Sequence, residues 1–269
     1  MTLSLDTRQR AMLAEMGLRL FEPVPIGRTD DTPPTPPRRA GGERLDEAPR
    51  ERVSAPMPPA APAAPAAPVP VERPVPVRAR SAVDQMDWDT LAQAVADCQA
   101  CGLCQGRRNT VFGVGDRQAQ WMVVGEAPGE NEDLQGEPFV GQAGRLLDNM
   151  LRNLGLDRQQ GVYIANVLKC RPPGNRNPAP EEVLQCEPYL RRQVALLQPR
   201  IILAMGRFAV QSLLGSTEPI GRLRGRVHDY QGVPVVVTYH PAYLLRNLPD
   251  KAKAWADLCL AMDVVAGKG

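Results

Sequence analysis

Four cysteines in two distant groups constrain the folding of this chain more than any other feature. Cys98 and Cys101 are separated by two residues, and Cys170 and Cys186, about seventy residues further on, are separated by fifteen. Four thiols in this order can hold a zinc ion or an iron–sulfur cluster. Either group requires two segments that are remote in the sequence to meet at one point.

Spacing alone leaves both the ligand set and the metal open. Cys104 follows Cys101 at the same interval, so Cys98 with Cys101 and Cys101 with Cys104 are equally good pairs. The alternative interpretation is that these residues are ordinary buried cysteines, which are common in protein cores. Two groups within one domain disfavour that interpretation. Cys259 stands among apolar residues and is expected to belong to the core.

Proline divides the chain into three parts. Sixteen of the 28 prolines lie between Pro23 and Pro76, and such a segment cannot bury enough apolar surface to offset its ordering entropy. We therefore expect a short amphipathic helix at residues 1–22, a disordered linker at 23–84 and a folded domain at 85–269. The helix has Leu13, Met16 and Leu20 on one face, so it either docks on a partner or packs on its own core.

The folded part alternates short apolar runs with amphipathic stretches, which predicts an α/β domain. Strands are expected at residues 121–124, 162–168, 201–204 and 233–238, and helices at 88–100, 142–154, 180–197, 207–214 and 252–265. The apolar runs have the length of buried strands. This order implies a mainly parallel sheet that is covered by helices on both faces.

Three polar motifs stand at the carboxyl ends of the expected strands. Gly125 and Glu126 follow the first strand, Asn166 lies near the end of the second, and His240 follows the fourth. Ligands of parallel sheets bind beyond the carboxyl ends of the strands. We therefore expect these residues to share one site.

The bulk composition places few limits on partners. A net charge of +2 does not by itself indicate nucleic-acid binding, so a phosphate-binding surface would need a local cluster such as Arg222, Arg224 and Arg226. No apolar run approaches the length of a membrane span, and the N-terminus lacks the apolar core of a secretory signal. We expect a cytoplasmic protein that has no membrane contact and whose cysteines are metal ligands or free thiols.

Four sequence strings occur in the order typical of one enzyme family. They are G-E-A-P-G-E-N-E-D at residues 125–133, G-E-P-F-V-G at 136–141, N-V-L-K-C-R-P-P-G-N-R at 166–176 and H-P-A-Y-L-L-R-N at 240–247. With this combination the chain resembles the family-4 uracil-DNA glycosylases over roughly residues 90–265. Gly106 and Arg107, followed by V-F-G at 111–113, match the family pattern that follows the first cysteine pair and select Cys98 and Cys101.

The resemblance implies a three-layer α/β/α sandwich with a four-stranded, mainly parallel sheet, preceded by the disordered N-terminal region. It also implies a [4Fe-4S] cluster held by Cys98, Cys101, Cys170 and Cys186. The implied activity is to flip uracil out of single- or double-stranded DNA and to hydrolyse its N-glycosidic bond, which leaves an abasic site for base excision repair. We expect a monomer that works at the bacterial nucleoid.

The resemblance also assigns roles in the pocket. Phe139 would stack on the flipped base, Asn166 would bond to O4 and N3–H of uracil, and His240 would stabilise the departing base. Glu126 and Ala127 would line the pocket.

The residue that positions the attacking water is less clearly marked. Related families have an aspartate where this chain has Ala127. Glu126, Glu132 or Asp133 would then position the water, and Glu132 is the preferred candidate. Residues 170–177 contain no histidine, unlike a branch of the superfamily that traps uracil-DNA covalently, so we expect hydrolytic turnover.

The last string is expected to contact DNA. The segment 243–247 would enter the minor groove, where Leu244 or Leu245 would fill the gap left by the flipped nucleotide. Arg246 and Arg224 would contact phosphates. The N-terminal helix resembles the short peptide by which the psi subunit of bacterial DNA polymerase III holoenzyme binds its chi partner, so a replication or repair protein is the expected partner of that helix.

Two other functions fit parts of the sequence. A cluster-bearing DNA-binding module would keep the arginines and leucines but would not need a complete pocket, whereas Phe139, Asn166 and His240 are all present. An acyl- or phosphate-transferring enzyme would use the glycine loop as an anion cradle. That enzyme needs a nucleophile or a Gly-Lys-Ser/Thr signature, and neither is visible.

Overall fold

The computed structural model describes residues 82–267. The amphipathic helix expected at residues 1–22 lies outside the described residues, as does nearly all of the expected linker. Within the described part, no helix combines the length and the apolar character that crossing a membrane requires.

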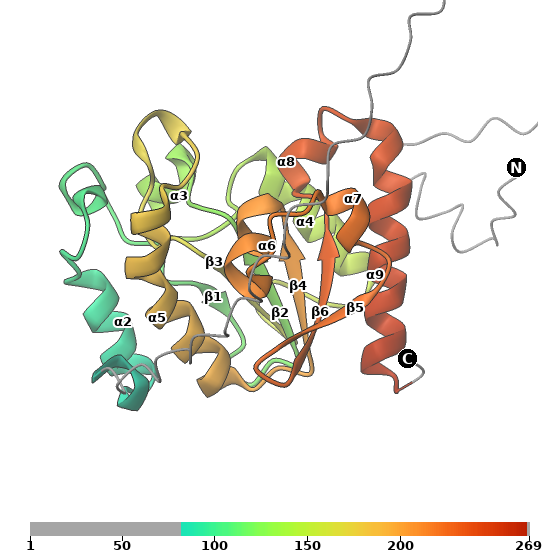
Figure 1. Ribbon diagram of the computed structural model, residues 1–269, viewed down its shortest axis with the longest axis horizontal. Helices are drawn as coiled ribbons and strands as arrows, with labels where there is room; N and C mark the ends of the chain where they lie inside the picture. The colour runs from blue at the N-terminus through green and yellow to red at the C-terminus, as the bar shows by residue number, and fades with distance from the viewer. Residues whose placement is uncertain (1–81, 268–269) are drawn as a thin grey trace, which may run out of the picture. The chain divides into compact units, whose positions relative to one another are not determined.

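Within residues 82–267, six strands are interspersed with helices (Figure 1). The strands are β1 (Val114–Gly115), β2 (Trp121–Gly125), β3 (Val162–Asn166), β4 (Ile201–Met205), β5 (Val227–Tyr230) and β6 (Val233–Thr238). The helices are α2 (Trp88–Ala96), α3 (Glu130–Gln135), α4 (Gln142–Asn153), α5 (Pro180–Leu197), α6 (Arg207–Leu214), α7 (Ile220–Leu223), α8 (Pro241–Leu244) and α9 (Lys251–Val265). Short 3₁₀ turns are η1 (Ala82–Gln85), η2 (Gly102–Gln105), η3 (Pro173–Asn175) and η4 (Leu248–Asp250).

The strands form one sheet in the order β1-β3-β2-β4-β6-β5. The inner four strands are parallel, and β1 and β5 are added antiparallel at the two edges. The expected four-stranded sheet was therefore incomplete. β1 has only two residues, and β5 alternates exposed and half-buried positions, so neither edge strand has the apolar run that marks a buried strand.

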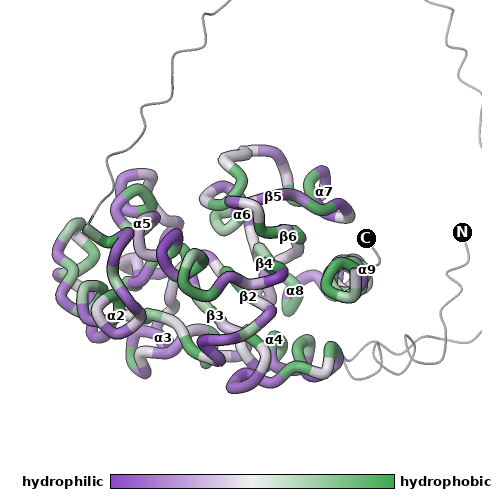
Figure 2. The backbone as a smooth tube through the Cα atoms, turned by 90° about the horizontal axis from the view of Figure 1, so that it is seen from below, coloured by the Kyte–Doolittle hydropathy of each residue, from purple (hydrophilic) through white to green (hydrophobic). Residues whose placement is uncertain are grey.

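Helices cover both faces of the sheet, which confirms the α/β/α sandwich. Alternate strand residues such as Trp121 and Val123 pack with α4, α8 and α9, whereas their neighbours Met122 and Val124 pack with α5 and α6. Figure 2 shows α5 and α6 on one side of the strands and α4 on the other. β2, β3 and β4 are buried from end to end, and β6 over its last four residues, because these strands contact helices on both faces.

The observed elements differ from the expected ones at the end of α2, at the end of β3 and in the acidic glycine loop. α2 begins at the expected cap, where the Asp87 carboxylate accepts a bond of 2.8 Å from the Thr90 N–H, but it ends at Ala96. β3 ends at Asn166; the Val167 N–H then bonds to the last residue of β2, Gly125, and the Leu168 N–H to Glu126 in the loop that follows. The acidic glycine loop contains a helix, α3, that the sequence pattern did not indicate.

Candidate active site

A cleft of about 770 Å³ opens at the carboxyl ends of the parallel strands. In Figure 1 the arrowheads of β4 and β6 point toward this edge, where α8 lies. The cleft is lined by residues from every expected motif: Glu126, Ala127, Glu132, Phe139, Asn166, His240 and Arg246. The structure therefore brings together the three strand-end motifs that the sequence placed at separate positions.

The deepest polar group of the cleft is the Asn166 amide. Asn166 is 2% exposed, and its Oδ1 has no hydrogen-bond partner within the described residues. A Cβ atom at Gly125 would lie 2.5 Å from Phe139 Cζ and closer still to Asn166 Oδ1, so only glycine fits between them. A buried acceptor without a partner costs free energy unless a ligand supplies the missing donor.

His240 also lines the cleft and stacks on Phe139. The two ring centroids are 5.4 Å apart, with 25° between the ring planes. His240 Nδ1 accepts a bond of 3.1 Å from the Ala242 N–H at the start of α8, so the ring proton resides on Nε2. The pKa of His240 is lowered to about 4, chiefly by burial; Glu132 opposes this shift and Arg246 adds to it. The ring is a neutral donor at physiological pH.

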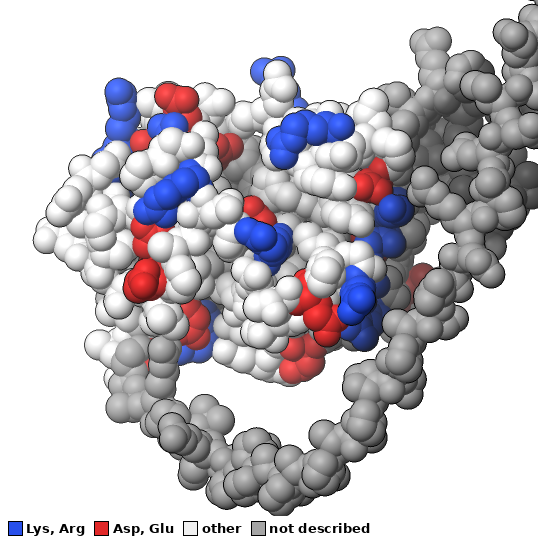
Figure 3. Space-filling model, turned by 45° about the horizontal axis from the view of Figure 1, so that its top comes forward, with Lys and Arg blue, Asp and Glu red and all other residues white. Residues whose placement is uncertain are grey.

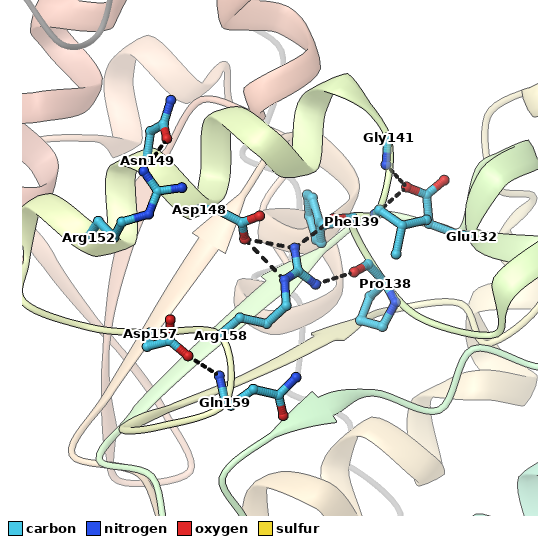
Figure 4. A network of polar contacts seen from close by, with 11 residues as sticks. Glu132, Pro138, Phe139, Gly141, Asp148, Asn149, Arg152, Asp157, Arg158 and Gln159 are labelled. Carbon is cyan, nitrogen blue, oxygen red and sulfur yellow. Dashed lines mark hydrogen bonds and ion pairs between the residues drawn. The ribbon is translucent and has the colours of Figure 1, made fainter.

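Phe139 is held in an unusual backbone conformation by groups that the sequence did not single out. Its φ is 56°. Arg158 donates to the carbonyl oxygens of Pro138 at 2.8 Å and Phe139 at 2.6 Å, and the Asp148 carboxylate holds the same guanidinium (Figure 4). No local sequence signal marks Arg158, because its partners are ten or more residues away and meet it only through folding.

The three carboxylates near the cleft all accept main-chain hydrogen bonds. Glu132 accepts from Gly129 at 3.1 Å, Val140 at 3.0 Å and Gly141 at 3.3 Å. It thereby joins the start of α3 to the Phe139 loop.

The Glu126 and Asp133 carboxylates also accept main-chain hydrogen bonds. Glu126 accepts from the Phe208 N–H at 3.1 Å, which joins the loop after β2 to the start of α6, and burial raises the pKa of its carboxyl. Asp133 is 3% exposed and accepts from the Arg108 N–H. Both carboxylates therefore already hold main-chain N–H groups.

The four residues expected to contact DNA differ in their surroundings. Leu244 is fully buried in the core beside α4 and α9, whereas Leu245 is 39% exposed. Arg224 forms an ion pair of 2.9 Å with the fully buried Asp257, so it supports the fold. Arg246 is exposed and lines the cleft.

A further exposed arginine at the cleft, Arg207, was missed by the sequence analysis. It begins α6 and lines the cleft. In Figure 3, Lys and Arg side chains are distributed over this face of the molecule instead of gathering in one patch. This distribution explains why charge patterning alone did not reveal Arg207.

The cysteines of the two groups meet beside α5. Cys170 and Cys186 are buried together, and Cys101 packs against them. Arg107 bridges the groups, because it donates to Cys170 Sγ at 3.2 Å and to the Cys98 carbonyl at 2.8 Å. The two remote segments that carry the cysteines therefore meet, as the cysteine pattern predicted.

Burial and nearby donors act in opposite directions on these thiols. Burial is the main cause that raises the pKa of Cys186 to about 12, and the Lys169 main-chain N–H opposes it. The Tyr189 hydroxyl bonds to Cys98. Across residues 82–267 no three His, Cys, Asp or Glu side chains are spaced to hold a metal ion. A four-iron cluster attaches each thiolate to a different iron, so its ligands stand farther apart than those of a single ion.

Comparison with known proteins agrees with the resemblance found in the sequence. The family model of the uracil DNA glycosylase superfamily matches residues 112–259. A type-4 uracil-DNA glycosylase of Archaeoglobus fulgidus is 46% identical over 165 residues, which cover 58% of this chain and 82% of the relative. A type-4 uracil-DNA glycosylase of Thermotoga maritima is 44% identical, with 59% and 83% covered.

A more distant relative comes from another branch. A type-5 uracil-DNA glycosylase of Pyrobaculum aerophilum is 37% identical over 150 residues, which cover 49% of this chain and 66% of the relative. The match to the family model spans more than half of the chain and includes every cleft residue named above. The chain therefore belongs to the uracil-DNA glycosylase superfamily.

Proposed function

We propose that this protein is a type-4 uracil-DNA glycosylase, which flips uracil out of DNA and hydrolyses its N-glycosidic bond for base excision repair. The observation that carries the proposal is the buried, unpartnered Oδ1 of Asn166 beside the Phe139–His240 stack. The identity of 41–46% to type-4 enzymes supports the same activity.

The Asn166 amide selects uracil by the order of its donor and acceptor. Its Oδ1 accepts the N3–H of uracil and its Nδ2 donates to O4. Cytosine presents an acceptor at N3 and a donor at N4, which leaves both amide groups facing like groups. Since a pocket built to hydrogen-bond one base rejects an analogue that leaves its polar groups unpaired, the unpartnered Oδ1 acts as a specificity element.

His240 stabilises the departing base. As the bond between C1′ and N1 breaks, its electron pair moves onto uracil N1 and is delocalised to O2. The neutral His240 donates its Nε2–H to O2, and the Ala242 N–H holds the ring in that tautomer. A donor placed where charge develops acts as an oxyanion hole does.

Water then adds to the sugar cation at C1′ and loses a proton to solvent. Glu126 and Glu132 are occupied by main-chain N–H groups, so we assign them to holding the walls of the cleft. The sugar cation is a strong electrophile, and its capture by water needs little help from a base. Ala127, where related families carry an aspartate, fits this assignment.

The cysteine site is proposed to hold a [4Fe-4S] cluster through Cys98, Cys101, Cys170 and Cys186. When bound, the cluster crosslinks the segment after α2 to the segment between β3 and α5. The donors from Arg107 and Tyr189 fit four anionic thiolates. The role is structural, since these residues belong to a separate buried group.

The substrate is DNA, and the contacts proposed for it lie at the rim of the cleft. Leu245 fills the gap left by the flipped base, and Arg246 and Arg207 contact phosphates. We propose that the protein acts as a monomer in the bacterial cytoplasm, at the nucleoid, on single- or double-stranded DNA. A replication or repair protein is the proposed partner of residues 1–22.

Uracil release from a single-stranded uracil oligonucleotide in EDTA tests the activity. Wild type should release uracil, whereas His240→Ala and Asn166→Ala should lose most of that activity. His228→Asn is the matched control. His228 lies on the edge strand β5, where it bonds to the Leu223 carbonyl, and it does not line the cleft. Tight binding of uracil-DNA without release would identify a binding module instead, and a complex that survives denaturation would identify a covalent trap.

A further inference from the structure

Lys169 places a buried ammonium group against the main chain of Asn166, the residue proposed to recognise uracil. Its side chain is 1% exposed. Its Nζ donates to Gln193 Oε1 at 2.7 Å, to the Asn166 carbonyl oxygen at 2.8 Å and to the Phe112 carbonyl oxygen at 3.3 Å. Three acceptors match the three donors of an ammonium group, so the group is fully satisfied without any contact to the cleft.

The Asn166 carbonyl needs this donor because the sheet ends beside it. The Val167 N–H bonds to the Gly125 carbonyl of β2, and across the planar trans peptide the Asn166 carbonyl points the opposite way. That direction leads to β1, which has two residues and pairs only with Ile164 and Tyr163. The lysine ammonium thus takes the place of a missing strand partner.

The ammonium is itself held by a closed polar network. Gln193, which is fully buried in α5, donates to the Phe112 carbonyl at 2.9 Å and to the Tyr163 hydroxyl at 3.2 Å. The Lys169 carbonyl accepts from the Val111 N–H at 2.8 Å. These bonds tie the end of β3 to α5 and to the segment before β1, so the ammonium has little freedom to move.

We propose that Lys169 is a positioning residue for base recognition, which fixes the strand end from which the Asn166 amide reads uracil. The next residue is Cys170, so the same lysine joins the pocket to the cysteine site. The inference rests on the proposed uracil excision. A lysine with a purely structural role would stabilise the fold without acting through Asn166.

A double-mutant cycle separates these two roles. Lys169→Met, which removes the donors at similar length, is made in wild type and in Asn166→Ala, and kcat and KM are measured on a single-stranded uracil oligonucleotide. We expect a loss of about tenfold or more in kcat/KM in the wild-type background. The loss should fall below about twofold in Asn166→Ala, because the residue through which Lys169 acts is absent.

Controls keep the result interpretable. Leu197→Ala, a core truncation at the end of α5, should lower the melting temperature and leave kcat/KM per folded molecule unchanged. Cluster absorbance is recorded for every variant. If Lys169→Met does not fold, the pair Lys169→Met and Gln193→Met, which makes both sides of one bond apolar, replaces it in the cycle.

Two results would overturn the inference. One is an equal loss of kcat/KM on Lys169→Met substitution in wild type and in Asn166→Ala. The other is a loss of kcat/KM that is proportional to the loss of cluster absorbance in every variant. Absence of uracil release by the wild type would instead remove the proposed function, so the two failures are distinguishable.

Discussion

Gly144 gives the sharpest test of how the pocket is positioned. A Cβ atom at this residue of α4 would overlap the Phe139 carbonyl group and lie 3.1 Å from the Phe139 Cα. The carbonyl cannot simply move aside, because Arg158 bonds to it at 2.6 Å and is itself held by Asp148. Gly144→Ala therefore pushes directly on the residue that stacks against His240.

The size of the effect follows from this geometry. Real Cβ atoms essentially never come within 3.0 Å of such a group, so the Phe139 carbonyl must shift by at least about 1 Å. A misplacement of about 1 Å in a catalytic site can cost roughly 100-fold in rate. Stability should change less, because overpacking costs about 1–3 kcal/mol and alanine in a helix recovers up to about 1 kcal/mol.

Single-turnover uracil release and thermal unfolding measure the two effects separately. We expect kcat/KM to fall about 100-fold while the variant remains folded. Gly102→Ala is the control, since no atom lies within 4 Å of its Cβ position. Retention of wild-type kcat/KM within about threefold by Gly144→Ala would refute the view that this contact positions Phe139.

Three further outcomes follow from the site. His240 should titrate near pH 4 by NMR, because burial lowers its pKa. The unfolded chain binds a proton at this histidine at higher pH than the folded protein does, so about 3 kcal/mol of the unfolding free energy should be lost as pH falls from about 6.5 to 4. Arg246→Gln should reduce the salt slope of DNA binding by about 1, whereas Arg224→Gln, which strands a buried carboxylate, should lower unfolding free energy by about 3–5 kcal/mol. Cys186→Ser should abolish the visible absorbance of the cluster, and Cys104→Ser should retain it. A titration near pH 6.5, a reduced slope in Arg224→Gln or a colourless Cys104→Ser protein would contradict these assignments.

The sequence by itself determined the layers of this protein and the position of its cleft. The inner strands are buried on both faces, so each appears as a continuous apolar run that is visible without any partner. The carboxyl ends of parallel strands share one edge, and this topological rule placed Asn166 and His240 in one site before any distance was known. The pattern of the remote cysteines likewise predicted that their segments would meet, and Cys101 packs against Cys170 and Cys186.

Tertiary structure alone decided which residues are free to act. Glu132 and Leu244 match motif positions and Arg224 belongs to a basic cluster, yet folding commits them to main-chain N–H groups, to the core and to a buried carboxylate. Arg158 carries no local signal, because its partners are ten or more residues away; Lys169 lies within a motif, but its bond to Gln193 of α5 forms only in the folded chain. A motif specifies the kind of side chain at a position, whereas its availability depends on every group that packs around it in three dimensions.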